Sequence, residues 1–190
     1  MRIISGRWKG RFLVAPRNLP VRPTTDMAKE SLFNILNNYY DMDEVTVTDL
    51  FAGTGNISYE FASRGAISVR SVDMDRGCTK YIAATARMLE FEGQISVINS
   101  DVFKYLATAR GESDIIFADP PYNMPAEKYN DIVRMVFERE LLSEEGVLVV
   151  EHPATIDLSS FPQYTQTRRY GTVHFSFFEW ESGEEEEDEE

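Results

Sequence analysis

Four consecutive residues near the middle of the chain combine a carboxylate, two prolines and an aromatic ring: Asp119, Pro120, Pro121 and Tyr122. They follow an apolar run at 114–118 that predicts a buried strand. Asp119 and the backbone carbonyl of Pro120 could each accept one N–H of an amino group on an aromatic base. The prolines fix the direction of that carbonyl because their rings lock φ, and Tyr122 offers a face on which the base can stack. The turn therefore favours chemistry at an amino nitrogen.

The ends of three other predicted strands carry a second set of candidate residues: Asp49, Gly53, Gly55, Asp73 and Asp101. The glycines let the backbone approach a ligand, and the acid 18 residues beyond Gly55 could accept both hydroxyls of a ribose. Asp101 could meet an adenine amino group or cap the helix that follows it. Each feature also has a purely structural explanation, and Ser58 replaces the third glycine of a dinucleotide fingerprint. Together they predict an adenine-nucleoside site, to which we add the adjacent Phe51, Met74 and Val102.

A methyl donor that carries an adenine nucleoside, S-adenosylmethionine, would suit both sets of residues. Its methyl sulfonium reacts by direct displacement, which requires neither a metal nor a nucleophilic side chain. His152 and His174 have no partners at metal-ligand spacing, and Cys78 is the only cysteine. We therefore expect S-adenosylmethionine as cofactor and no metal.

Hydrophobic periodicity indicates which elements must position these residues. It predicts strands at 45–50, 67–73, 95–99, 114–118 and 146–151, and helices at 57–64, 75–92 and 129–142, with 107–113 unassigned. A further helix beyond Pro23 is expected to bury one face, formed by Met27, Leu32, Ile35, Leu36 and Tyr39. Two extended runs around Gly171 predict a terminal antiparallel hairpin. The pattern indicates an α/β fold in which helices cover both faces of a mostly parallel sheet.

Charge is distributed unevenly along the chain, whose net charge is −13. The first 22 residues contain six basic residues and no acid, and the last twelve contain nine acids and no base. A basic head indicates contact with nucleic acid, although a solvated arm would look similar. We expect Arg7, Lys9 and Arg11 to contact RNA and the acidic end to be a disordered tail.

Length and composition predict one domain with small appendages. We divide the chain into a basic extension or hairpin at 1–23, a catalytic domain at 24–180 and an acidic tail at 181–190. The chain has no membrane-length apolar run and no recognisable signal peptide, and its single cysteine suits a reducing compartment. We therefore expect a cytoplasmic protein.

Several sequence motifs make the chain similar to a known family. The stretches DPPY and DLFAGTG resemble those of class I S-adenosylmethionine-dependent amino-methyltransferases, which have a Rossmann-like fold with a seven-stranded sheet. MRIISGRWKGR, RPTTDMAKESLFNIL and DLFAGTGNISYEFASRGA, in this order, narrow the resemblance to bacterial 16S rRNA guanine-N2 methyltransferases. The resemblance covers about residues 1–180, and its combined motifs are specific.

The resemblance implies a substrate and the roles of individual residues. It implies methylation of the guanine at nucleotide 966 of 16S rRNA, within an assembled or nearly assembled small subunit. We expect the protein to act as a monomer. It assigns the strand-end acids and glycines to the methyl donor, 119–122 to the base, and Arg22, Pro23 and Thr24 to the substrate side. Asn56 and Ser58 depart from many relatives and could alter the donor-site turn, and the acidic tail is not a family feature.

Other functions share parts of this pattern. Adenine-N6 DNA methyltransferases and release-factor glutamine methyltransferases share the acid-Pro-Pro-aromatic turn, but the former usually carry a larger recognition segment and the latter usually have Asn in place of Asp119. A non-catalytic RNA-binding assembly factor would not need an intact turn at 119–122. A dehydrogenase is the weakest alternative, because Ser58 interrupts the fingerprint and no acid suited to hydride transfer is evident.

Overall fold

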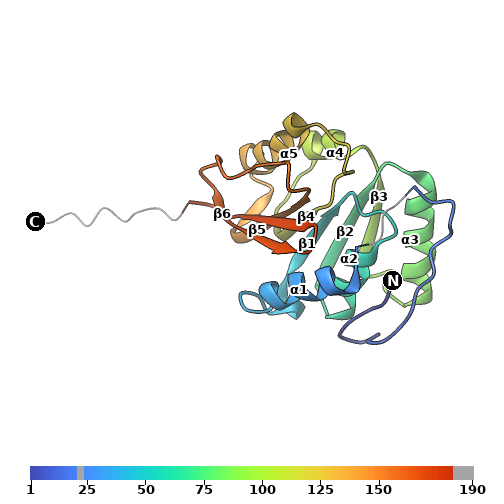
Figure 1. Cartoon of the computed structure of the whole chain (residues 1–190). Coiled ribbons are helices and arrows are strands. Elements are labelled where there is room, and N and C mark those ends of the chain that lie inside the picture. The colour runs from blue at the N-terminus through green and yellow to red at the C-terminus, as the bar shows by residue number, and fades with distance from the viewer. Residues whose placement is uncertain (21–23, 182–190) are drawn as a thin grey trace, which may run out of the picture.

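The computed structural model describes residues 1–20 and 24–181, which form one seven-stranded sheet (Figure 1). The strand order is β3-β2-β1-β4-β5-β7-β6. β1 to β5 run parallel, whereas β7 pairs antiparallel with both β5 and β6. The predicted mostly parallel sheet with a terminal hairpin is confirmed. The bounds are β1 Thr46–Leu50, β2 Ser68–Asp73, β3 Ile95–Asn99, β4 Ser113–Ala118, β5 Leu142–His152, β6 Tyr164–Tyr170 and β7 Val173–Phe178.

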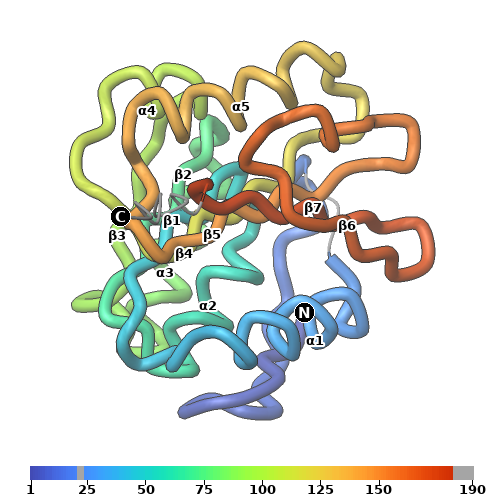
Figure 2. The backbone as a smooth tube through the Cα atoms, turned by 90° about the vertical axis from the view of Figure 1, so that its left-hand side faces the viewer, coloured from blue at the N-terminus to red at the C-terminus, as the bar shows by residue number. Residues whose placement is uncertain are grey.

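Five α-helices in the described chain cover the two faces of the sheet: α1 Asp26–Leu36, α2 Asn56–Ser63, α3 Arg76–Met88, α4 Val102–Thr108 and α5 Ala126–Glu138. Figure 2 shows α4 and α5 on one side of the sheet and α1 to α3 on the other. A 3₁₀ turn, Met42–Glu44, connects α1 to β1. None of the described helices is long and apolar enough to cross a membrane.

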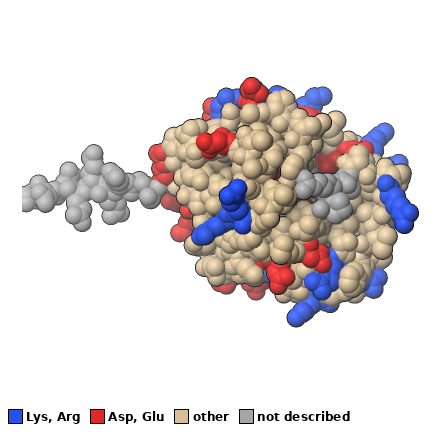
Figure 3. Space-filling model, viewed as in Figure 1, with Lys and Arg blue, Asp and Glu red and all other residues tan. Residues whose placement is uncertain are grey.

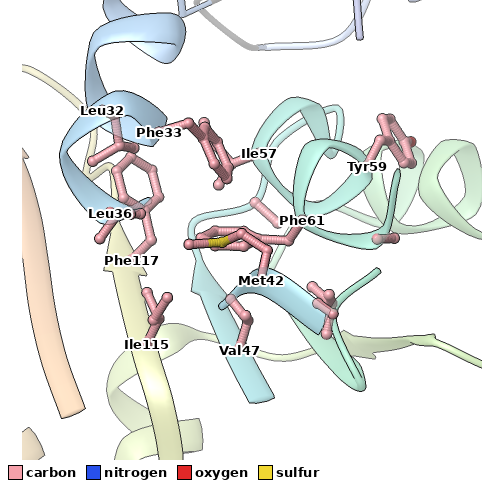
Figure 4. Packing of buried hydrophobic residues seen from close by; sticks show 14 of the residues in the cluster. Leu32, Phe33, Leu36, Met42, Val47, Ile57, Tyr59, Phe61, Ile115 and Phe117 are labelled. Carbon is pink, nitrogen blue, oxygen red and sulfur yellow. The ribbon is translucent and has the colours of Figure 1, made fainter. Parts of the chain in front are cut away.

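The core on the α1–α3 side is built by aromatic and branched side chains from α1, α2, β1 and β4. Figure 4 shows Phe33 of α1 and Phe61 of α2 in one cluster with Val47 of β1 and with Ile115 and Phe117 of β4. The rings of Phe33 and Phe61 meet edge to face, with 4.6 Å between their centroids. This packing fixes α2, whose first turn follows the glycine-rich loop after β1.

The structure corrects several predicted boundaries and one predicted face. Met27 and Tyr39 are exposed, whereas Leu32 and Leu36 are buried as predicted, and the buried face of α1 also includes Ala28, Lys29 and Phe33. Helix α3 ends at Met88 rather than 92, because Glu90 adopts a left-handed conformation and the Phe91 amide bonds back to the Ala86 carbonyl.

Two other elements begin earlier than the sequence predicts. Strand β5 begins at Leu142 rather than 146, through a register shift opposite β4 that accommodates the polar 143–145 segment. Helix α5 spans Ala126–Glu138 rather than 129–142, and its buried residues are Tyr129, Ile132, Val133, Val136 and Phe137.

The N-terminal residues form a short hairpin that packs on α2 and α3. The Ile3 amide donates to the Arg11 carbonyl, and the Leu13 amide donates to the Met1 carbonyl. The Trp8 indole N–H donates to the Leu89 carbonyl at 2.9 Å. The hairpin is therefore part of the folded body (Figure 1).

A buried ion pair joins this hairpin to the rest of the molecule. Lys29 and Glu60 have fully buried side chains, with 3.2 Å between Nζ and Oε2. Glu60 also accepts hydrogen bonds from the backbone amides of Ile4 and Ser5, and Lys29 donates to the side-chain oxygen of Asn56. Burial lowers the pKa of Lys29, which the adjacent Glu60 carboxylate opposes.

Candidate functional site

A cavity of about 940 Å³ opens at the carboxyl ends of the parallel strands. It lies where the strand order reverses between β1 and β4, the position at which open α/β sheets bind ligands. The cavity brings together most residues of the two predicted sets. Its lining includes Asp49, Phe51, Gly53, Asp73, Met74, Asp101 and Val102, with Thr24, Asp119, Pro120, Pro121 and Tyr122.

Asp73 is held in place at the end of β2 by two backbone amides. Its Oδ2 accepts from the Gly53 N–H and its Oδ1 from the Asp75 N–H, both at 2.8 Å. Each carboxylate oxygen can still accept a second hydrogen bond. Burial raises the pKa of Asp73, against the effect of the two amides. The carboxylate thus links the loop after β1 to the loop after β2.

Asp49 is buried beneath the glycine-rich loop, and its carboxylate accepts a hydrogen bond from the Ser58 hydroxyl. Ser58 is the residue that replaces the third glycine of the dinucleotide fingerprint. The Ser58 hydroxyl lies 2.5 Å from Asp49 Oδ2 and 2.7 Å from the Ser71 hydroxyl. Burial raises the pKa of Asp49 to about 7. Ser58 therefore fixes the Asp49 carboxyl from below the cavity.

The two glycines of the loop have different positions. Gly53 lines the cavity with φ +57°. Gly55 precedes α2 with φ +82° and does not line the cavity, and a Cβ there would lie 2.7 Å from the Tyr59 ring. The absence of a side chain at Gly55 therefore lets the loop lie close to α2, and its positive φ also favours glycine.

The side chain of Asp101 both lines the cavity and caps α4, where it accepts from the Lys104 amide at 3.0 Å. Its neighbour Val102 is buried in the core, as is Leu106 one turn later. The two roles that the sequence suggested for Asp101 are thus compatible.

The turn after β4 is anchored to the elements on both of its sides. The Asp119 amide donates to the Leu50 carbonyl of β1 at 3.3 Å. The Pro121 carbonyl accepts from the Met124 amide at 2.9 Å and from the Tyr129 hydroxyl of α5 at 3.4 Å. Pro120 is buried, whereas Asp119 and Tyr122 are half-buried. The turn therefore presents its acidic and aromatic side chains to the cavity from a fixed backbone.

Sequence reasoning missed part of the cavity wall. Glu151 lies at the end of β5, where the argument used for the other strand ends could have found it. The hairpin residues Met1 and Leu13 and the β7 residue Val173 also line the cavity, but no motif distinguishes them. Within residues 1–20 and 24–181 no group of three or more His, Cys, Asp or Glu side chains could hold a metal ion.

The three predicted RNA-contacting residues of the hairpin lie on the surface, outside the cavity. Arg7, Lys9 and Arg11 are exposed, and Arg7 pairs with Glu90 of the loop after α3. The guanidinium carbons of Arg7 and Arg11 lie 5.7 Å and 5.9 Å from the Trp8 ring centroid. Figure 3 shows basic side chains along the edge where the N-terminal segment and α3 lie in Figure 1. The predicted substrate residues Arg22 and Pro23 lie outside the described residues, as does 182–190, most of the predicted acidic tail.

Comparison with known proteins connects this site to a family. Residues 1–179 match the family model described as "Conserved hypothetical protein 95". A putative rRNA methyltransferase, YlbH of Bacillus subtilis, is 36% identical over 83% of this chain and 85% of its own length. Ribosomal RNA small subunit methyltransferase D of Escherichia coli is 30% identical over 85% of this chain and 79% of its own length.

A solved structure extends the likeness to three dimensions. The putative methyltransferase yhhF from Escherichia coli superposes with a TM-score of 0.82 at 26% identity, over 94% of this chain and 96% of its own. The topology of the described sheet is thus that of a class I methyltransferase. On the family model, the sequence relatives and the shared fold, the chain belongs to this family of S-adenosylmethionine-dependent rRNA methyltransferases.

Proposed function

We propose that this methyltransferase transfers a methyl group from S-adenosylmethionine to the exocyclic N2 amino group of one guanine in 16S rRNA. The observation that carries the proposal is the meeting of the Asp119–Tyr122 turn with the acids of β1, β2 and β3 in one cavity. That cavity, at about 940 Å³, is at the upper end of the range for single small-molecule sites, about 300–1,000 Å³. It has room for both a nucleoside donor and a base.

The donor half of the cavity, defined here as the lining residues from the ends of β1, β2 and β3, suits S-adenosylmethionine. Asp73 has acceptor capacity left for the ribose hydroxyls, and Asp101 can accept the adenine amino group. Phe51, Met74 and Val102 supply apolar wall, and Gly53 allows close backbone approach. Asp49 adds a carboxylate near the positively charged end of the donor. When bound, S-adenosylmethionine supplies an electrophilic methyl group.

The acceptor half, defined as the lining residues from the ends of β4 and β5 with those of the hairpin, Thr24, Thr25 and Val173, would hold the base. Asp119 accepts one amino N–H and the Pro120 carbonyl accepts the other, which aims the nitrogen lone pair at the methyl carbon. The negative charge of Asp119 stabilises positive charge that develops on this nitrogen as the new bond forms, and Asp119 can take the released proton. Tyr122 stacks on the base.

Access of the RNA depends on the basic head. We propose that Arg7, Lys9, Arg11 and Arg22 contact RNA phosphates while Thr24 faces the base. The substrate would be the assembled or nearly assembled small subunit in the cytoplasm, and the enzyme would act as a monomer.

One experiment tests the proposal and separates it from its rivals. The protein is incubated with methyl-labelled S-adenosylmethionine and, separately, with unmethylated small subunits, naked 16S rRNA, duplex DNA or release factor. We expect label only in rRNA, with a single N2-methylguanine after nuclease digestion and mass spectrometry. Label in adenine, in DNA or in protein would contradict the proposal, and no label in any substrate would favour a non-catalytic assembly factor.

A further inference from the structure

The register of β4 and β5 sets a second carboxylate beside Asp119. Ala118 pairs with Val150 in parallel register, so the next residues of the two strands, Asp119 and Glu151, are neighbours across the sheet. Adjacent parallel strands lie about 4.8 Å apart. Glu151 belongs to the described part of β5, is 4% exposed and lines the cavity.

Both carboxylates point to the same face of the sheet. Phe117 of β4 and Val149 of β5 belong to the core under α1 and α2, whereas Ala118 and Val150 belong to the core under α4 and α5. Side chains alternate along a strand, so Asp119 and Glu151 return to the face of Phe117 and Val149. The acceptor half therefore holds two neighbouring carboxylates.

The edge of guanine presents donors that match this pair. Its N1–H and N2 amino group are adjacent donors, so a guanine whose amino group is held by Asp119 and the Pro120 carbonyl presents N1–H beside them. We propose that Glu151 accepts this N1–H and thereby selects guanine. The inference rests on the proposed function and names how that site would recognise its base.

The same carboxylate would reject bases that lack the N1 hydrogen. Adenine has an acceptor at N1 and cytosine has an acceptor beside its amino group, so each would place a lone pair against the Glu151 carboxylate. A buried polar group left without its partner makes such discrimination strong. Glu151 thus acts as a specificity-determining residue, while Asp119 acts on the reacting nitrogen.

A test requires a base that keeps the amino group but lacks the N1 hydrogen, and 2-aminopurine is such a base. Small subunits are assembled with 16S rRNA carrying either guanine or 2-aminopurine at the methylated nucleotide. The ratio of kcat/KM for the two substrates is measured for the wild-type protein, for Glu151→Gln and for Glu144→Gln. Glu144 is an exposed residue of the same strand and serves as the matched control. Donor affinity and thermal melting are measured on each protein.

We expect the wild type and the Glu144→Gln control to prefer guanine by about 10- to 100-fold, the range for one hydrogen bond to a charged group. In Glu151→Gln the carboxamide can donate to the bare N1 of 2-aminopurine, so the preference for guanine falls by about 10- to 100-fold relative to the wild type while donor affinity is unchanged. The intrinsic reactivities of the two amino groups cancel when this ratio is compared between variant and wild type.

Two results would overturn the inference without touching the proposed function. One is an equal kcat/KM of the wild-type enzyme for the guanine and the 2-aminopurine subunits, a result that does not depend on whether any variant folds. The other is a Glu151→Gln enzyme that slows on both substrates and keeps its preference, as a purely structural residue would. If the wild type leaves N2 of guanine unmethylated in intact subunits, it is the proposed function that fails.

Discussion

The two halves of the cavity are built differently. In the donor half each acid is bonded by groups from a strand-end loop or from the first turn of the helix that follows it: Asp73 by Gly53 and Asp75, Asp101 by Lys104, and Asp49 by Ser58. The acceptor half combines the turn after β4 with Glu151, the N-terminal hairpin and Val173, which are far apart in the sequence. The donor half is thus specified by short motifs, and the acceptor half by the fold.

This difference predicts that the two halves can be impaired separately. Substitutions in the donor half are expected to weaken donor binding, and substitutions in the acceptor half to slow the chemical step or impair RNA binding.

The largest effect is expected from Asp119→Ala, which removes the proposed amino-group acceptor. kcat on small subunits should fall by about 10²–10³-fold, the usual cost of deleting one preorganised transition-state partner. The donor Kd, measured by calorimetry, should stay within about twofold, because Asp119 belongs to the other half. An equal loss of donor affinity would show that the two halves are not separate.

Asp73→Asn tests the donor half with little change of shape. We expect donor binding to weaken by about 1–3 kcal/mol, because one charged acceptor is lost. kcat at saturating donor should change little. Asp131→Asn on the outer surface of α5 is the control, and it should bind the donor as the wild type does. Normal donor affinity in Asp73→Asn would remove this residue from the site.

The hairpin is tested by changing Arg7, Lys9 and Arg11 to Gln together. KM for the subunit should rise about tenfold, and the slope of log KM against log salt should fall by about two to three as three phosphate contacts are lost. Donor affinity should be unaffected. A matched triple on the opposite side of the sheet, Lys104, Arg110 and Arg134 to Gln, should leave KM unchanged. If the two triple variants show the same KM and the same salt dependence, Arg7, Lys9 and Arg11 make no specific contact with RNA.

The smallest effect concerns pH. Burial raises the pKa of Asp49 to about 7, so its carboxyl is neutral below that pH and ionised above it. The ionised form attracts the cationic donor, and we expect the donor Kd to fall about three- to tenfold between about pH 6 and pH 8. In Asp49→Asn the Kd should be flat across this range, as calorimetry in matched buffers would reveal.

The same carboxyl affects the stability of the free protein with the opposite sign. Its folded pKa of about 7 lies above the ordinary value of 3.8, so the folded state binds the proton more tightly than the unfolded chain does. Its contribution to stability therefore decreases as pH rises from about 4 through about 7. Melting curves of Asp49→Asn should lack that part of the slope.

The sequence predicted the elements whose signal is local. Apolar strands with Asp49, Asp73, Asp101 and Asp119 at or near their carboxyl ends indicated both the sheet and most of the donor half, because acids and glycines mark the places where such strands end. The sequence could not reveal the burial of Lys29, because a lysine on a helix is usually exposed to solvent. Its burial depends on the pairing with Glu60, which lies 31 positions later in the chain. The exposure of Met27 and Tyr39 likewise depends on which elements pack around α1.

The acceptor half shows the same limit. Met1, Leu13 and Val173 are ordinary apolar residues whose place in the cavity depends on how the hairpin and β7 fold back. Glu151 carried a usable signal, a carboxylate at a strand end, but only the strand register reveals that its neighbour is Asp119.

The attachment of the N-terminal hairpin has a consequence for the order of folding. Its anchors are distant: Ile4 bonds to Glu60, 56 positions away, and Trp8 bonds to Leu89, 81 positions away. During synthesis the hairpin residues leave the ribosome before α2 and α3, but they must wait for α2 and the end of α3 before these bonds can form, and closing such long loops is slow. The hairpin is therefore expected to be secured later than its place in the sequence would suggest. Substitutions at Trp8 should then speed unfolding more than they slow folding.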